Sequence, residues 1–230
     1  MILKENKYTN MQKNAYKDGT TNHEEHNRNQ DYWDILLGDL KNSEEWVGKS
    51  ALDFACGKGR NVLNMYSISN WLKVDGVDIS ESNIDYCKKT YTNMPFNWFC
   101  NNGVDLSELN DNNYDFVMST IALQHIPVYD IRKNILMEIF RVLKPEGLFS
   151  FQMGFGEDLS DSLGRSKSSY YENAYDAVGT NSLHDVRVQN EEDIKKDLNE
   201  IGFKNIKTEI RNSYSDAGHP KWIYVKCYKP

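Results

Sequence analysis

The residues with the clearest chemical signature lie at positions 51–61, where an apolar segment containing one acid runs into a glycine turn. Residues 51–54 are typical of the end of a buried strand, Gly57 and Gly59 belong to the turn, and residues 61–65 begin a helix-like stretch. A strand that enters a helix through such a turn brings free backbone N–H groups and a helix N-terminus together, where the chain can approach a ligand closely. The pattern therefore predicts a ligand-binding site at the C-terminal end of this strand.

Two acids and one apolar side chain narrow the choice of ligand. Asp78 lies 19 residues beyond Gly59, at the end of the next expected strand, where a carboxylate can accept hydrogen bonds from both hydroxyls of a ribose. The fingerprint of nicotinamide and flavin sites requires a small residue where this chain has Val62. That fingerprint also lacks an acid at the position of Asp53. A ribose-bearing ligand other than these dinucleotides is favoured, while a nucleotide-dependent oxidoreductase and a purely structural turn remain as alternatives.

This combination resembles the class I S-adenosylmethionine-dependent methyltransferases, in particular their small-molecule branch with a methyltransferase type 11/25-like domain. The similarity extends over residues 30–153 and includes the turn at residues 143–147 before the fifth expected strand. It implies S-adenosylmethionine as the cofactor, S-adenosylhomocysteine as the product, and methyl transfer to a small-molecule acceptor. A non-catalytic module that binds the same cofactor for regulation is the alternative.

The resemblance also implies cofactor contacts residue by residue. Asp78 matches the ribose contact, residues 102–105 the adenine edge, and residues 119–125 the surroundings of the methionine moiety. Ala55 stands where the family has its first glycine, and Asn102 stands where it has an acid, whose role an amide oxygen can take over. The implied cofactor residues are Asp53, Ala55, Cys56, Gly57, Gly59, Arg60, Asn61, Asp78, Ile79, Asn102, Gly103, Val104, Ser119 and Trp33.

The expected reaction is an in-line displacement at the sulfonium methyl, which needs alignment and exclusion of water more than acid–base chemistry. A base is required only where the accepting atom arrives protonated, and His125 is the candidate because imidazole titrates near neutral pH. The alternative is that His125 packs against the cofactor or caps a turn. Trp33 and Tyr16 from the N-terminal helices are candidates to close over the cofactor, and a plain core position is the alternative for Trp33. The substrate-pocket candidates are Gln124, Tyr170, Tyr171, Tyr175 and His184, with Asp185 beside them, and packing or surface positions are the alternative for those of the expected lid.

Strands and helices alternate between residues 50 and 153, which predicts an α/β fold with a doubly wound, mostly parallel, seven-stranded Rossmann-like sheet and helices on both faces. Helices are expected after the caps Ser80 and Asn190, over residues 130–143 with a clear apolar face, and up to Gly202. The last strand is expected to be antiparallel. The expected strands are residues 51–54, 71–78, 96–100, 114–118, 148–153, 206–210 and 222–228.

Two segments fall outside this alternation. Residues 1–45 are predicted to form an N-terminal arm with cap helices, a short one at residues 11–16 and another at residues 31–40, ahead of a methyltransferase domain at residues 46–230. Residues 154–189 lack periodicity and are rich in Gly, Ser, Asp and Tyr, which favours a lid inserted after the fifth strand over a disordered loop.

Composition limits the class of protein further. A net charge of −7 argues against a surface built for nucleic acid, and no apolar run approaches the roughly 18 residues needed to cross a bilayer. Four cysteines without paired spacing, and no visible signal sequence, predict a cytoplasmic protein with free thiols. His23 and His26 do not match the spacing of a zinc motif, so no metal site is expected. We expect a monomer or homodimer with no nucleic-acid or membrane partner.

Overall fold

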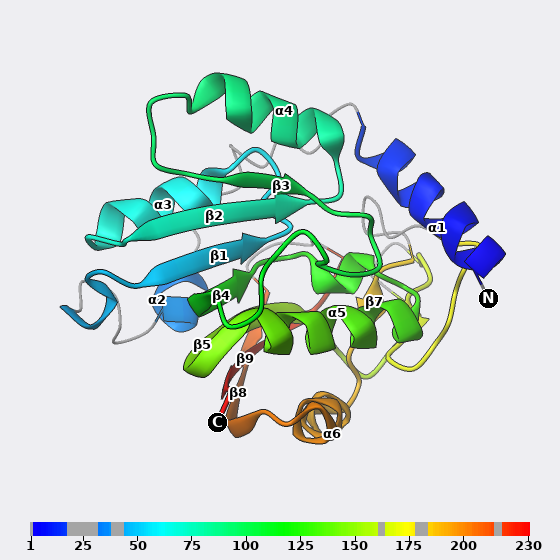
Figure 1. Cartoon of the computed structure of the whole chain (residues 1–230). Coiled ribbons are helices and arrows are strands. Elements are labelled where there is room, and N and C mark those ends of the chain that lie inside the picture. Colours follow the sequence, from blue (N-terminus) through cyan, green and yellow to red (C-terminus); the bar gives the residue numbers. More distant parts are fainter. Residues whose placement is uncertain (1, 18–31, 38–43, 161–163, 178–183, 214–217) are drawn as a thin grey trace.

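The structure, a computed structural model, describes residues 2–17, 32–37, 44–160, 164–177, 184–213 and 218–230, without the side chains of residues 2 and 32–34 (Figure 1). The strands in these ranges are β1 (Ser50–Phe54), β2 (Lys73–Asp78), β3 (Trp98–Cys100), β4 (Tyr114–Ser119), β5 (Leu143–Phe155), β6 (Ser168–Ser169), β7 (Val186–Arg187), β8 (Lys204–Asn212) and β9 (Lys221–Tyr228). The α-helices are α1 (Ile2–Ala15), α2 (Tyr32–Leu37), α3 (Arg60–Ile68), α4 (Glu81–Thr90), α5 (Tyr129–Val142) and α6 (Glu191–Ile201). Two 3₁₀-helices, Glu44–Trp46 and Leu123–His125, complete the described elements.

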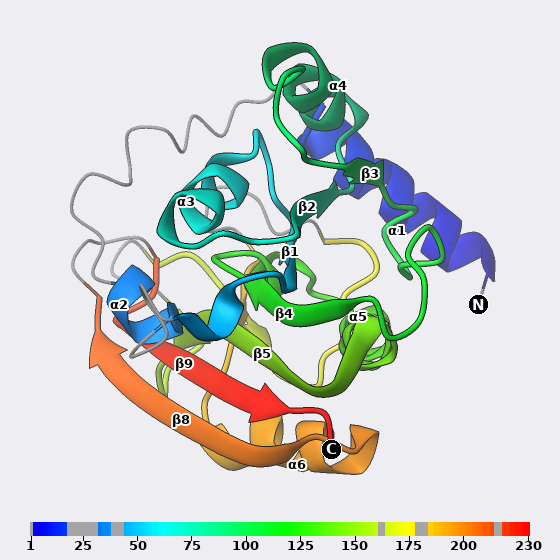
Figure 2. The ribbon, with the colours of Figure 1, turned by 60° about the vertical axis from the view of Figure 1, so that its left-hand side comes forward.

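The large sheet has the strand order β3-β2-β1-β4-β5-β9-β8. The first five of these strands are parallel, and β9 runs antiparallel between β5 and β8 (Figure 2). The chain order reverses at β1 and β4, so their C-terminal ends flank a topological switch point, where open α/β sheets bind ligands. The predicted doubly wound, mostly parallel sheet with an antiparallel last strand is confirmed.

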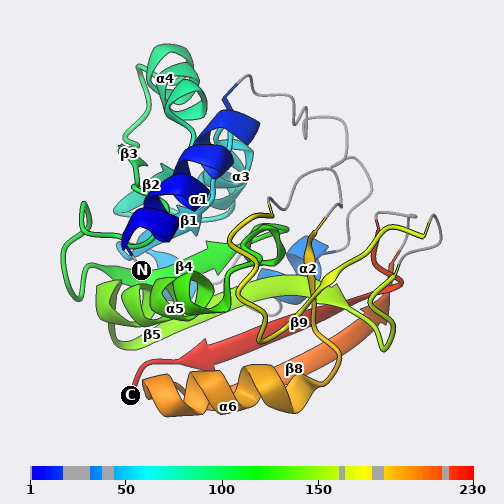
Figure 3. The ribbon, with the colours of Figure 1, turned by 90° about the vertical axis from the view of Figure 1, so that its right-hand side faces the viewer.

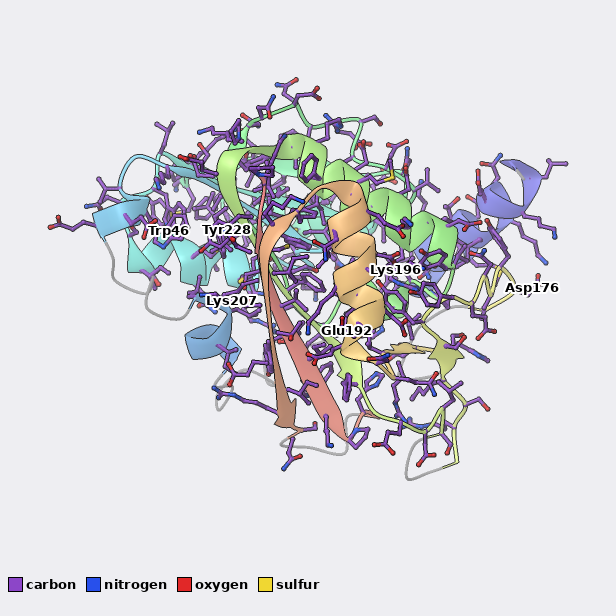
Figure 4. All side chains as sticks on the ribbon, turned by 90° about the horizontal axis from the view of Figure 1, so that it is seen from below. Trp46, Asp176, Glu192, Lys196, Lys207 and Tyr228 are labelled. Atoms are coloured by element: carbon purple, nitrogen blue, oxygen red, sulfur yellow. The ribbon has the colours of Figure 1, made fainter. Side chains whose placement is uncertain are left out.

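Helices cover both faces of this sheet. The apolar side chains of α2, α3 and α4 join one core cluster, and those of α5 and α6 join the cluster on the other face. In α5 the buried stripe contains Ile131, Ile135 and Ile139, as its periodicity predicted. Figure 4 shows α6 lying along β8 and β9, with Lys196 on the helix and Lys207 on the strand.

The predicted helix ends are confirmed by their hydrogen bonds. The side chain of Ser80 accepts the N–H of Asn83 at the start of α4, and that of Asn190 accepts the N–H of Glu192 at the start of α6. Gly202 ends α6 with a φ of 119°. These caps are local signals, which explains why the sequence alone places them.

Strand β5 is longer than the predicted segment 148–153. It begins at Leu143, directly after α5, because Leu143 pairs with Tyr114 of β4. It extends to Phe155 because the antiparallel partner β9 continues beside it as far as Lys221. Pairing with neighbouring strands, rather than the strand's own sequence, therefore sets both of its ends.

Helix α1 differs most from the sequence-based prediction. It has 14 residues, whereas a short helix at residues 11–16 was expected. Its sequence carries no apolar stripe, and the residues it buries include Tyr8, Thr9 and Gln12, two of them polar. Short helices in proteins are stabilised mainly by tertiary contacts, so the extent of α1 follows from what it packs against.

Contacts at both ends hold α1 across the edge of the sheet. The arrowheads of β1, β2 and β4 point toward α1 in Figure 1, and Figure 3 shows the helix passing in front of that edge. After its C-terminal end, the carbonyl oxygen of Tyr16 accepts a hydrogen bond from Ser80 Oγ at 2.8 Å. Toward its N-terminal end, Lys7 pairs with Asp176 at 2.7 Å, and Figure 4 places Asp176 beside α1. The helix thus caps the C-terminal ends of the parallel strands.

The segment after β5 is tied to the body of the protein in its described part. Strands β6 and β7 pair in parallel, and β7 contacts both β5 and the 3₁₀-helix Leu123–His125. His23, His26 and the end of the helix expected at residues 31–40 lie outside the described residues. None of the described helices is long and apolar enough to cross a membrane.

Candidate functional site

A pocket lies at the C-terminal ends of β1, β2 and β4, beneath α1. The structure brings to its walls the glycine turn, the end of β2 and the segment after β4, together with Tyr8, Gln12 and Tyr16. Of these three, Tyr16 was expected from the sequence, whereas Tyr8 and Gln12 carried no signal. The residues assigned from the sequence that line the pocket are Ala55, Cys56, Gly57, Arg60, Asn61, Asp78, Ile79, Gly103 and His125.

The glycine turn has three residues in the left-handed backbone region. The φ angle is 61° at Ala55, 52° at Gly57 and 83° at Gly59. The N–H of Cys56 donates to Val77 O at 3.0 Å, and the N–H of Gly59 donates to Cys56 O at 2.9 Å. A residue with a Cβ in this region costs roughly 1–2 kcal/mol. Ala55 therefore adopts the left-handed conformation that the turn requires, at a cost that a glycine would avoid.

The two glycines of the turn have different surroundings. Replacing each by alanine should therefore lower the free energy of unfolding by different amounts. A Cβ at Gly59 would lie 2.6 Å from Trp98 Cη2 and 3.0 Å from Tyr91 Cε2, whereas a Cβ at Gly57 meets no atom within 4 Å. Backbone strain and overpacking together predict that Gly59→Ala lowers the free energy of unfolding by about 2–4 kcal/mol. Gly57→Ala has only the strain and should lose about 1 kcal/mol. Urea unfolding measures both, and equal losses would contradict this explanation.

Asp78 ends β2 with its carboxylate at the wall of the pocket. Its Oδ2 accepts the N–H of Gly57 at 2.8 Å, and its Oδ1 accepts the N–H of Ser80 at 2.8 Å. Burial raises the pKa of Asp78, and the hydrogen bonds from Ser80, Gly57 and Asn83 oppose that rise. A carboxylate has about four acceptor sites. The same group can therefore fix the glycine turn and still accept hydrogen bonds from a ligand.

The segment expected at the adenine edge exposes a different residue to the pocket. Asn102 does not line it, and its Oδ1 already accepts the N–H groups of Val104 at 2.8 Å and Asp105 at 3.0 Å. Its neighbour Asn101 lines the pocket, and the buried Oδ1 of Asn101 has no hydrogen-bond partner among the described residues. No sequence signal separates two adjacent asparagines; the path of the chain after β3 decides which one faces the pocket.

His125 lines the pocket from the 3₁₀-helix that follows β4. Its Nδ1 lies 2.7 Å from Asp185 Oδ1, and its carbonyl oxygen accepts a hydrogen bond from Gln12 Nε2 at 2.9 Å. Burial alone lowers the pKa of His125, but the charge and hydrogen bond of Asp185 more than offset this effect, so the pKa lies above its ordinary value. A histidine that faces a pocket with a buried carboxylate behind it is suited to accepting a proton.

The three tyrosines expected at the substrate pocket lie elsewhere. Tyr170 and Tyr171 pack edge-on against Tyr129 of α5, with ring centroids 6.0 and 5.0 Å away. Tyr175 packs edge-on against Tyr8 at 6.3 Å, behind the pocket wall. The described part of residues 154–189 contributes Asp185 to the site, from behind His125, rather than these rings.

The other assigned residues do not line the pocket. Asp53 is buried in β1, where burial raises its pKa to about 8 against the opposing charge of Arg60. Gln124 is buried, His184 is exposed, and Trp33 belongs to α2 but its side chain is not described. The assigned residues outside the lining are Asp53, Gly59, Asn102, Val104, Ser119, Gln124, Tyr170, Tyr171, Tyr175 and His184.

Solved structures with the same fold come from several methyltransferases. A putative S-adenosylmethionine-dependent methyltransferase of Listeria monocytogenes is 19% identical with a TM-score of 0.59, over 86% of this chain and 97% of that one. The phosphoethanolamine N-methyltransferase 2 of Haemonchus contortus, solved with phosphomonomethylethanolamine and S-adenosylhomocysteine, is 19% identical with a TM-score of 0.61. There the match covers 86% of this chain but only 53% of that one.

A third solved structure with this fold carries a different activity in its name. The [4+2]-cyclase SpnF is 14% identical with a TM-score of 0.64, over 86% of this chain and 79% of that one. At these identities the likeness is one of fold alone. No curated protein sequence matches the chain significantly.

The sequence itself matches a family model. Residues 52–151, which run from β1 to the middle of β5, match the model described as a methyltransferase domain. This segment contains the glycine turn, Asp78 and His125, the residues that build the pocket from the sheet side. Residues 52–151 therefore match a methyltransferase domain, and the chain as a whole shares the fold of S-adenosylmethionine-dependent methyltransferases.

Proposed function

We propose that this protein transfers the methyl group of S-adenosylmethionine to a small, uncharged acceptor whose nucleophilic atom arrives protonated. The observation that carries the proposal is that one pocket joins Asp78 and the glycine turn with His125. The first two bind a ribose-bearing cofactor, and the third accepts a proton. In this proposal residues 46–230 form the catalytic domain, residues 1–45 form its cap, and the protein acts as a monomer or homodimer.

The residues of the pocket fit the cofactor. Asp78 would accept hydrogen bonds from the ribose hydroxyls, and the positive charges of Lys58 and Arg60 beside the glycine turn suit the carboxylate of its methionine part. The buried Oδ1 of Asn101 offers an unused acceptor to the exocyclic amine of adenine. When bound, S-adenosylmethionine supplies an electrophilic methyl group on a sulfonium.

The part of the pocket around His125 indicates the class of acceptor. The same lining includes Tyr16, whose ring lies near that of His125, together with Tyr8, Ile126 and Ile135, which offer aromatic and apolar surface. The cations that line the pocket, Lys58 and Arg60, come from the glycine turn and its helix. A neutral molecule with a hydroxyl or amine to be methylated fits these walls better than a phosphorylated one.

Isothermal titration with S-adenosylhomocysteine, followed by a methyl-transfer assay, tests this function. We expect micromolar binding of S-adenosylhomocysteine, no binding of NAD under the same conditions, and transfer of labelled methyl to members of a panel of phenols, alcohols and amines. Phosphorylated analogues of the best acceptor serve as the matched control and should react poorly. Absence of binding at millimolar S-adenosylhomocysteine would refute the proposal.

A second function is supported by the structural neighbour named as a [4+2]-cyclase, since it indicates that this fold is not confined to methyl transfer. In this case the protein would bind the cofactor without transferring its methyl group, as would a regulatory module. Tight binding of S-adenosylmethionine without label transfer across the whole panel would favour this function. Binding of NAD instead would favour an oxidoreductase.

A further inference from the structure

We propose that Asp185 and His219 are positioning residues that hold His125 in the tautomer whose Nε2 accepts a proton from the pocket. This proposal rests on the function proposed above and identifies the residues that position its general base. The three side chains come from distant parts of the chain: the 3₁₀-helix after β4, the residue before β7, and the turn between β8 and β9.

The first contact fixes the proton of His125. Its Nδ1 lies 2.7 Å from Asp185 Oδ1, and the Asp185 side chain is only 2% exposed. An ionised carboxylate can only accept hydrogen bonds, so Nδ1 must carry the proton in the neutral imidazole as well as in the cation. The proton-free nitrogen of neutral His125 is therefore Nε2.

The second contact fixes His219 in the opposite tautomer. Its Nε2 lies 3.3 Å from Asp185 Oδ2, and its Nδ1 lies 3.4 Å from Arg187 Nε. A guanidinium can only donate, so Nδ1 of His219 must accept, and its proton must sit on Nε2, where it donates to Asp185. Burial lowers the pKa of His219, consistent with a neutral ring. Asp185 thus receives one N–H from each histidine.

The surroundings of His219 hold it in this place. The His219 side chain is fully buried, and a Cβ at Gly154 of β5 would lie 2.1 Å from its ring. Arg187 is held in turn by carbonyl oxygens, its Nη1 donating to Asp158 and Ser160 and its Nη2 to Gly218. With both partners immobile, Asp185 has one orientation toward His125.

Three groups face His125 and set its charge balance. Asp185 favours the imidazolium, Lys167 opposes it, and Tyr16 from the end of α1 lies with its ring centroid 6.4 Å away. Burial raises the pKa of the Tyr16 hydroxyl, so it is uncharged at neutral pH. Asp185 keeps its charge because its two histidines outweigh the effect of burial and lower its pKa.

The step that this arrangement serves is a single proton transfer. The O–H or N–H bond of the acceptor breaks, its electron pair stays on the acceptor atom, and an N–H bond forms at His125 Nε2. The resulting imidazolium is stabilised by Asp185, which stays ionised. Asp185 and His219 do not touch the acceptor; they act through the tautomer and orientation of His125.

Nuclear magnetic resonance of the full chain, labelled with ¹⁵N at histidine, tests the proposal without cofactor or acceptor. The spectrum of His125→Gln identifies the His125 signals by their loss. We expect neutral His125 to show a protonated Nδ1 and a bare Nε2, and His219 to show the reverse over the accessible pH range. A protonated Nε2 in neutral His125, the form that free imidazole side chains prefer, would overturn the proposal.

Asp185→Asn supplies a sharper test because Arg187 restricts how the new amide can turn. His219 still donates from Nε2, so the amide oxygen must face His219 and its NH₂ must face His125 Nδ1. We expect His125 to switch to the Nε2–H tautomer and its pKa to fall by about one unit or more. Adding His219→Phe frees the amide to rotate and should restore part of the Nδ1–H form. An unchanged tautomer in folded Asp185→Asn would overturn the proposal.

The two proposals fail separately. Binding of S-adenosylhomocysteine by a protein whose His125 has the wrong tautomer would refute the positioning role alone. If the histidines show the expected tautomers but the protein does not bind S-adenosylhomocysteine, the proposed function is refuted and the positioning role is not. If the Asp185 variant does not fold, the wild-type spectrum by itself still decides the positioning role.

Discussion

Asp78→Ala is expected to weaken binding of S-adenosylhomocysteine by about 100-fold or more. The carboxylate would accept hydrogen bonds from two ribose hydroxyls, and hydrogen bonds to a charged group contribute roughly 1.5–3 kcal/mol each. It also accepts the N–H of Gly57 at 2.8 Å, so its loss loosens the turn on which the cofactor would rest. Isothermal titration measures the affinity.

Asp115→Ala is the matched control for Asp78→Ala. Asp115 also accepts a backbone N–H from a neighbouring segment, that of Ser50 at 2.8 Å, but it does not line the pocket. Its removal should lower stability without changing affinity in the protein that remains folded. Equal weakening in the two variants would show that a general loosening of the sheet, and not the contact of Asp78 with the ligand, is being measured.

The parts of the site that could be predicted from sequence are those built by neighbouring residues. Residues 51–61 contain both the strand and the turn, and Asp78 ends the strand that lies directly beside β1. Because parallel strands end at the same edge, the spacing between the glycine turn and Asp78 is enough to predict that they meet, as the hydrogen bond from Gly57 to Asp78 shows. The caps Ser80 and Asn190 are local in the same sense.

The remaining parts of the site depend on packing between distant segments. Asp185 reaches His125 across 60 positions of the chain, and His219 reaches Asp185 across 34. Nothing in a single sequence indicates such pairings. Tyr170 and Tyr171 were predicted to line a substrate pocket, but their rings pack against Tyr129 of α5, and this contact leaves no mark on the sequence. Tyr8 and Gln12 could not be predicted as pocket residues for a related reason. Helix α1, which carries them, has no apolar stripe of its own and is stabilised by its contacts with the rest of the protein.

His125→Ala is expected to reduce kcat/KM for the best acceptor by about 10²–10⁴-fold, the usual contribution of a positioned general base. The affinity for S-adenosylhomocysteine should change little, because the ribose contact and the glycine turn are untouched. His184→Ala is the matched control, since His184 is exposed and does not line the pocket. It should keep the activity of the wild type.

The pH dependence separates a base from a packing residue at position 125. The base is active only when neutral, and the Asp185 carboxylate raises the pKa of His125 above its ordinary value of 6.5, against the opposing effect of burial. The activity of the wild type should therefore be complete above this raised pKa and fall tenfold per pH unit below it. The residual activity of His125→Ala should lack this fall and should increase when imidazole is added. A His125→Ala enzyme with the rate and pH profile of the wild type would instead assign His125 to packing against the cofactor or capping a turn.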